Sequence, residues 1–93
     1  MVNSFEVGAI IVTTGIHERC KEDPEFNRFV ASSLSRHSVG DWGDLSTVDE
    51  AANNNALKIG GRLFSKYKQG DDSIYIITEA DRSMTTILFA DEY

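Results

Sequence analysis

The densest group of polar side chains lies at residues 79–83, where Glu79, Asp81, Arg82 and Ser83 lie between two apolar runs. Carboxylates, a guanidinium and a hydroxyl this close together could form a small recognition or catalytic surface, since Arg82 could bind a carboxylate or a phosphate through its fork of donors. The alternative is structural: Asp81 and Ser83 close a hairpin by bonding to nearby backbone amides, and Arg82 pairs with a neighbouring acid. We favour the structural interpretation.

The second candidate is an acidic stretch around the only tryptophan, Trp42. Residues 40–56 contain no Lys or Arg but four acidic residues, among them Asp41 and Asp44. An aromatic anchor within an acidic rim is typical of protein interfaces and would attract a basic partner. Trp42 could instead fill the core, with the acids solvated and capping helices. Both alternatives stay open, because tryptophan is usually mostly buried yet seldom entirely so.

Three other side chains have the chemistry of bases, metal ligands or nucleophiles, namely His17, Cys20 and His37. No spacing in the chain indicates the three or four converging ligands that a divalent metal needs. Nothing in the sequence holds a base against Cys20. We therefore expect structural or surface roles for these residues, and no cofactor. Phosphate-binding glycine motifs, dinucleotide fingerprints, nucleophile elbows and EF-hand loops are also missing from the sequence.

The composition limits the classes of partner. The 93 residues include nine Lys and Arg against fifteen Asp and Glu, so the formal net charge is −6. This balance repels phosphate backbones, so no nucleic-acid partner is expected, and a mimic of duplex DNA would carry far more charge. The apolar stretch at residues 10–12 is too short to span a bilayer, so no membrane partner is expected. A single cysteine excludes an intrachain disulfide and fits a reducing compartment, which makes the cytoplasm the expected location.

The elements that position these side chains begin with an N-terminal strand. Residues 5–13 form a β-branched run with apolar side chains on both faces, which predicts a strand that is largely covered. A short helix is compatible with the residues that follow, and Thr14 is a plausible cap for it.

Two further helices are indicated by capping residues. Asp23 followed by Pro24 predicts the start of a helix with one apolar stripe, and Gly40 is a reasonable stop. Ser46 could cap a third helix, which should end before the two glycines at 60–61.

The apolar pattern then changes to short β-rich runs at residues 62–68, 73–79 and 84–90, separated by turn residues. They predict a three-stranded antiparallel meander. The whole chain, 1–93, is therefore expected to be a single α+β domain: an N-terminal strand, two or three helices, then the meander, with the helices packed on one face of the sheet. The place of the first strand in that sheet is left open.

With these segments laid out, the sequence resembles a family of small bacterial proteins carried on plasmids, prophages and other mobile elements. The resemblance covers most of the chain. It is carried by the opening strand with its Thr-Thr-Gly and by the segments RHSVGDWGDL, ALKIGGRLFSKY and IYIITEADRSMTTILFADEY. What it implies is a mobile-element setting and an unassigned function, with no catalytic residues to carry over.

Members of that family sometimes bear the label of a type I restriction methylase subunit. This chain is far too short for that role and lacks a cofactor-binding glycine loop, so we treat the label as an error of association. One departure from the family is Ala90-Asp91, where a proline would be expected.

Three hypotheses about function follow. The leading one is a non-enzymatic cytoplasmic binding or accessory module, with a counter-defence role as one option, that engages a protein partner. Its interaction residues would be Asp41, Trp42, Asp44, Glu79, Asp81, Arg82 and Ser83. The alternative is a small enzyme or ligand-binding domain centred on Arg82 with Glu79, Asp81 and His37, which needs a pocket where these groups converge. The third is a homodimer formed through an exposed edge of the meander or an apolar sheet face.

Overall fold

The structure is a computed structural model that describes residues 4–93. It has an α+β architecture, with one four-stranded mixed sheet and three α-helices. No helix in that range is long and apolar enough to cross a membrane. In chain order the elements are β1 (Ala9–Val12), α1 (Thr14–Glu22), α2 (Pro24–Ser38), α3 (Thr47–Ile59), β2 (Leu63–Gln69), β3 (Asp72–Thr78), β4 (Met84–Phe89) and the 3-10 turn η1 (Ala90–Glu92).

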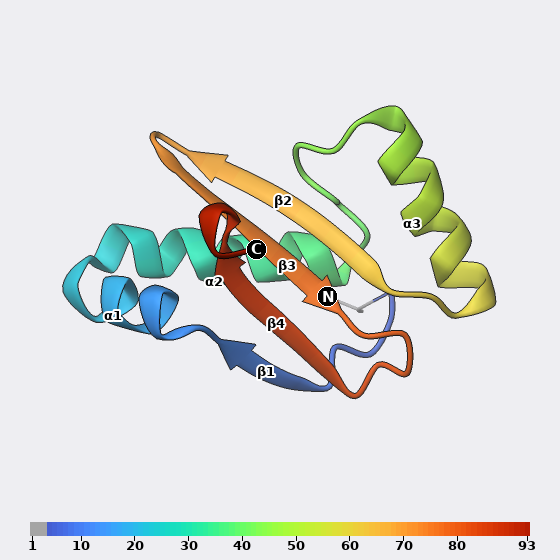
Figure 1. Ribbon diagram of the computed structural model, residues 1–93, viewed down its shortest axis with the longest axis horizontal. Helices are drawn as coiled ribbons and strands as arrows, with labels where there is room; N and C mark the ends of the chain where they lie inside the picture. The colour runs from blue at the N-terminus through green and yellow to red at the C-terminus, as the bar shows by residue number, and fades with distance from the viewer. Residues whose placement is uncertain (1–3) are drawn as a thin grey trace.

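The sheet has the order β1-β4-β3-β2 (Figure 1). Strands β2, β3 and β4 are paired antiparallel, whereas β1 pairs parallel with β4. The predicted description, a three-stranded antiparallel sheet with an unplaced first strand, is therefore corrected to one four-stranded mixed sheet. A parallel pair requires a long crossover connection, and here the connection contains all three helices and the other two strands.

The prediction that the helices all pack on one face of the sheet is wrong. Helices α1 and α2 pack together on one face, which we call the inner face, and α2 runs behind the sheet in Figure 1. Helix α3 instead lies beside the outer edge of β2. Its Asn53 side chain bonds both backbone groups of Phe64 in that strand, which places the helix at the edge.

The helix starts follow local capping chemistry. Asp23 accepts bonds from two backbone amides of α2 with Pro24 as the first helical residue, and Ser46 accepts one from α3, so both predicted caps are confirmed. The first helix is capped by Thr13 rather than by Thr14, because the Thr13 hydroxyl accepts the bond from the Ile16 amide.

The main core lies between the inner face of the sheet and helices α1 and α2. It contains the buried residues Ile16, Phe26, Val30, Tyr67, Ile74, Ile76 and Ile87. A second, smaller cluster joins α3 to the start of β2 through Trp42, Ala56 and Leu63. Burial of this apolar surface is the main stabilising contribution to the fold.

The first strand differs most from its prediction. It covers only residues 9–12 of the expected 5–13, and every residue in it is exposed. Ile10, Ile11 and Val12 have exposed fractions of 43%, 42% and 38%. The prediction of a largely covered strand is therefore wrong, because β1 lies at the edge of the sheet, beyond the part of the inner face that α1 and α2 cover.

Candidate interaction surface

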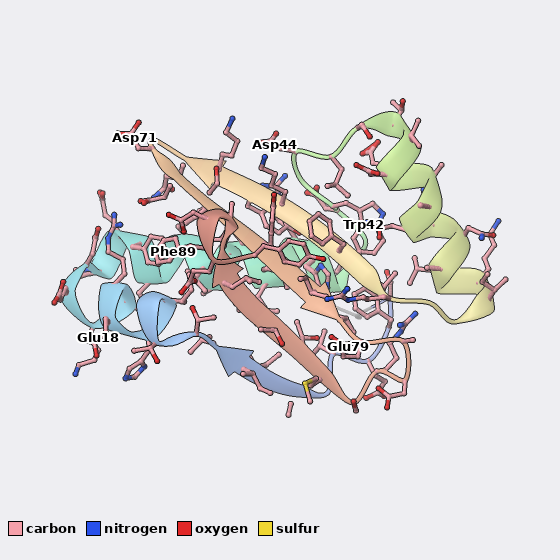
Figure 2. The ribbon with its side chains drawn as sticks, in the orientation of Figure 1. Glu18, Trp42, Asp44, Asp71, Glu79 and Phe89 are labelled. Atoms are coloured by element: carbon pink, nitrogen blue, oxygen red, sulfur yellow. The ribbon has the colours of Figure 1, made fainter. Side chains whose placement is uncertain are left out.

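Trp42 belongs to the core. Its side chain is only 3% exposed, its ring stacks on Phe5 at 6.0 Å between centroids and meets His37 edge-on at 5.6 Å. Its indole N–H donates to the Asn54 side-chain oxygen at 3.1 Å. Figure 2 shows Trp42 between α3 and the sheet, apart from Asp44 in the exposed loop before α3. The acidic surface around this loop therefore has no exposed tryptophan as an anchor.

The loop residues around Trp42 cover the outer edge of β2. The Lys66 amide donates to the Trp42 carbonyl at 3.2 Å, and the Asp44 amide donates to the Lys66 carbonyl at 2.7 Å. Gly43, between them, has φ +76° and approaches the Lys66 carbonyl so closely that a Cβ would collide with it. Together with the Asn53 amide on Phe64, these bonds occupy backbone groups that an edge strand would otherwise present to solvent.

Asp41 forms an ion pair with Arg36. Both its carboxylate oxygens accept from the Arg36 guanidinium, at 2.8 and 3.1 Å. This bidentate pair holds the pKa of Asp41 below its ordinary value, with a smaller contribution from the Gly43 amide. Asp41 thus stabilises the loop, while the side chain of Asp44 is exposed.

The segment 79–83 acts mainly as a turn. The Asp81 carboxylate accepts from the Ser83 amide at 3.0 Å, as the structural interpretation predicted. The side chain of Ser83, and to a lesser extent this amide, hold the pKa of Asp81 below its ordinary value. Glu79 lies 3.9 Å from the Arg62 guanidinium, an ion pair that is half exposed. Figure 2 shows Glu79 at the end of β3, far along the sheet from Asp44.

Arg82 donates to backbone carbonyls. The prediction that it pairs with a neighbouring acid is therefore wrong. Its guanidinium donates to the carbonyls of Glu79 and Ala80 in its own turn, and to those of Ala56 and Gly61 at the end of α3. The Ala56 carbonyl also accepts from the Gly60 and Gly61 amides, and a cation at this end of a helix interacts favourably with the helix dipole. Arg82 therefore ties the β3–β4 turn to α3.

His37 lies in a buried chain of hydrogen bonds whose direction can be derived. The Thr85 hydroxyl must donate to the Val7 carbonyl at 2.7 Å, so it accepts from the Thr78 hydroxyl at 2.7 Å. The Thr78 hydroxyl then accepts from His37 Nε2 at 2.8 Å, which places the ring proton on Nε2. A neutral His37 leaves Nδ1 to accept from the Ser65 hydroxyl.

This chain of bonds holds His37 neutral and out of contact with solvent. The side chain is fully buried, and burial, with the positive charge of Arg82 as a smaller cause, lowers the pKa of His37 to about 4. The ring joins α2 to β2 and β3, and through Thr85 to β4 and the segment before β1. Its burial and bonding indicate a structural role instead of that of a base for a bound ligand.

The remaining candidates are not brought together. Within residues 4–93 no group of three or more His, Cys, Asp or Glu is placed to hold a metal ion. Cys20 is half buried, and burial raises the pKa of its thiol, which makes it a weaker nucleophile. A hollow of about 320 Å³ between α3 and Phe64 is lined by Arg62 and Tyr93 among others, but not by Arg82 or His37.

The surface that sequence reasoning missed is the free edge of β1. Met84 of the neighbouring strand is 36% exposed and lies on the same face of the sheet as Ile11, whereas Ile10 and Val12 lie on the other face, so both faces of this edge expose apolar side chains. The signal for it in the sequence is the apolar run on both faces of this strand, a pattern that also predicts a strand covered on both sides. The same pattern fits a strand whose cover is supplied by another molecule.

Comparison of the chain with protein-family models, with curated proteins and with solved structures finds no match. Among the described residues the conspicuous polar and aromatic side chains, Trp42, Arg82 and His37, face inward, and the β1 edge faces solvent.

Proposed function

We propose that this chain is a non-enzymatic binding module of mobile-element origin that engages a protein partner through the free edge of β1. The observation that carries the proposal is the exposure of Ile10, Ile11 and Val12 on an edge strand. Clustered apolar side chains next to unpaired backbone groups are a ready template for another chain. The resemblance to mobile-element proteins supports an accessory setting, with counter-defence as one such role.

The contrast between the two edges of the sheet supports this choice of surface. The β2 edge is occupied by the segment Trp42–Asp44 and by the Asn53 side chain. At the β1 edge nothing within residues 4–93 pairs with the strand on its outer side. The strand also lacks a charge, a proline or a bulge of the kind that protects edges in monomeric proteins.

The interaction residues first considered lie elsewhere, and their contacts favour the β1 edge over them. Trp42 is buried, Arg82 donates to four carbonyls, and Asp81 closes a turn. A ligand-binding or enzymatic domain centred on Arg82 would need to break the bonds that join this turn to α3. Those bonds, and the burial of His37, favour a binding module over that alternative.

The test is quantitative capture of partners by the tagged chain in cells of its own source. Ile11→Lys places a charge at the β1 edge, and Val48→Lys is the matched control, since Val48 is a 76% exposed side chain on α3. We expect a stoichiometric partner with the unmodified chain and the control, and its loss with Ile11→Lys. Equal capture by all three, or no partner above background, would contradict the proposal.

A further inference from the structure

The backbone of β1 presents a defined set of hydrogen-bonding groups to solvent. The Ala9 amide donates to Ser83 and the Thr13 amide donates to Ile87, so residues 9, 11 and 13 turn their backbone groups toward β4. In a parallel pair alternate residues face the neighbouring strand. Ile10 and Val12 therefore direct their amides and carbonyls away from the sheet. An added strand would find two donors and two acceptors there.

The side chains at this edge favour an added strand that has apolar side chains on both of its faces. Ile10 and Val12 share the inner face with Thr85 and Ile87, their partners in the register, whereas Ile11 lies on the opposite face. Side chains of an added strand would lie directly beside them, at the spacing of cross-strand pairs. An occupant with three consecutive apolar residues would cover Ile10 and Val12 on one face and Ile11 on the other.

The charges around the edge select basic residues beyond that apolar core. Residues 1–18 and 83–93, which contain both strands of this edge, include four acidic residues and no Lys or Arg. Arg19 and Arg82 adjoin these ranges, but Arg19 is paired with Asp23 and Asp72, and Arg82 donates to backbone carbonyls at the end of α3. Glu6 is exposed three residues before β1. At the other end Glu92 is held beside the strand, since one of its oxygens accepts from the Thr13 hydroxyl at 2.8 Å. The strand itself is neutral and lies between acidic groups.

We propose that the occupant of the β1 edge is an extended segment of a protein partner, with an apolar centre and basic residues at both ends, added to the sheet as a fifth strand; this inference rests on the proposed function. Backbone bonds give such a segment its affinity, and the alternate side chains with the flanking charges give its specificity. A second copy of this chain fits less well, because its own acidic ends would oppose Glu6 and Glu92.

The probe is the heptapeptide KKVIVKK, followed by NMR chemical shifts of the labelled chain. EEVIVEE has the same centre with reversed charge. A third peptide carries N-methyl groups on its three apolar residues, so it keeps the side chains but cannot donate from those amides in either strand direction. We expect KKVIVKK to shift the amides of Ile10 and Val12, EEVIVEE to bind at least about tenfold more weakly, and the methylated peptide not to bind.

Two double variants of the chain test which acidic residues cause the preference for a basic peptide. Glu6→Gln combined with Glu92→Gln removes two negative charges while keeping an acceptor for Thr13 and for the Phe89 amide. Asp44→Asn combined with Asp71→Asn removes the same charge at the side of the molecule away from β1 in Figure 2. The first pair should reduce the preference for KKVIVKK over EEVIVEE several-fold, and the second should leave it nearly unchanged.

The outcomes separate this inference from the proposed function. If KKVIVKK and EEVIVEE bind β1 equally, the basic preference is overturned, while binding at the edge stands. If no peptide binds but Ile11→Lys still loses the cellular partner, strand addition by a basic segment is overturned. If the chain associates with itself at this edge, and Ile11→Lys makes it monomeric, the occupant is a second copy and the inference is wrong.

Discussion

At the scale of single residues, side-chain type is a poor guide to which groups meet solvent. Trp42, Arg82 and His37 have the chemistry of an anchor, an anion receptor and a base, yet each has its partners inside the protein. Asp81 and Ser83 behave as turn residues whose bond lies within the chain segment itself. That bond is local, which is why the structural interpretation of this pair was correct from sequence.

Acid should destabilise the protein through His37. The folded state lowers the pKa of His37 to about 4, so between about pH 6.5 and 4 the unfolded chain binds a proton that the folded chain does not. The free energy of unfolding should therefore be fully retained above about pH 7. It should fall as the pH drops through this window, by roughly 3 kcal/mol in total.

Urea unfolding at a series of pH values between about 7 and 5 measures this effect. The carboxylates with a lowered pKa, Asp23, Asp41 and Asp81, lose their contribution mainly below this range. The His37→Gln variant should have lower stability at neutral pH but a flatter profile. An unchanged slope in that variant would assign the acid sensitivity to other groups.

Removal of Arg82 should destabilise the fold measurably. Arg82→Ala removes the guanidinium bonds that join the β3–β4 turn to the end of α3, including the bond to the part-buried Gly61 carbonyl, and a hydrogen bond from a charged group contributes about 1.5–3 kcal/mol. Arg62→Ala is the control, because its pair with Glu79 is half exposed and long at 3.9 Å. Urea midpoints should fall clearly for the first variant and hardly at all for the second. Similar midpoints would show that Arg82 is dispensable.

At the scale of the elements, the sheet has one protected edge and one open edge. Strand β2 is covered by the segment Trp42–Asp44 and by Asn53. In both cases hydrogen bonds to backbone groups of β2 hold the cover in place. Strand β1 is short and carries no such cover among the described residues. The difference follows from chain connectivity, because the loop before α3 and the helix itself pass alongside β2.

Gly43 should be the more sensitive of two glycines with positive φ. A Cβ at Gly43 would collide with the Lys66 carbonyl, whereas at Gly70 nothing lies within 4 Å. Both have left-handed backbones, with φ of +76° and +59°, so alanine costs about 1 kcal/mol of strain at either. Gly43→Ala should lose at least about 1 kcal/mol more than Gly70→Ala in thermal or urea unfolding. Equal losses would mean that the loop can move away from β2 without penalty.

The molecule as a whole carries a net charge of −6, and residues 1–18 and 83–93, which contain β1 and β4, include no Lys or Arg. Two copies brought together at β1 would place like charges at both ends of the shared strand. The distribution of charge thus favours a basic partner and disfavours self-pairing at the same surface.

The isolated chain should therefore be monomeric. Light scattering at several concentrations up to about 100 µM should give a constant mass close to 10.3 kDa at moderate salt. High salt screens the repulsion, so any weak association should increase with ionic strength. A stable dimer at low salt would contradict the role assigned to these charges.

Features with local causes could be predicted from the sequence. The caps at Asp23 and Ser46 join a side chain to amides two or three residues away, and the antiparallel pairing of β2, β3 and β4 follows from short turns and a period of two. The parallel pairing of β1 with β4, the burial of Trp42 and the hydrogen-bond chain through His37 depend instead on long-range contacts in the folded chain. Their partners lie far along the chain, and the energy of such contacts depends on which elements meet in space.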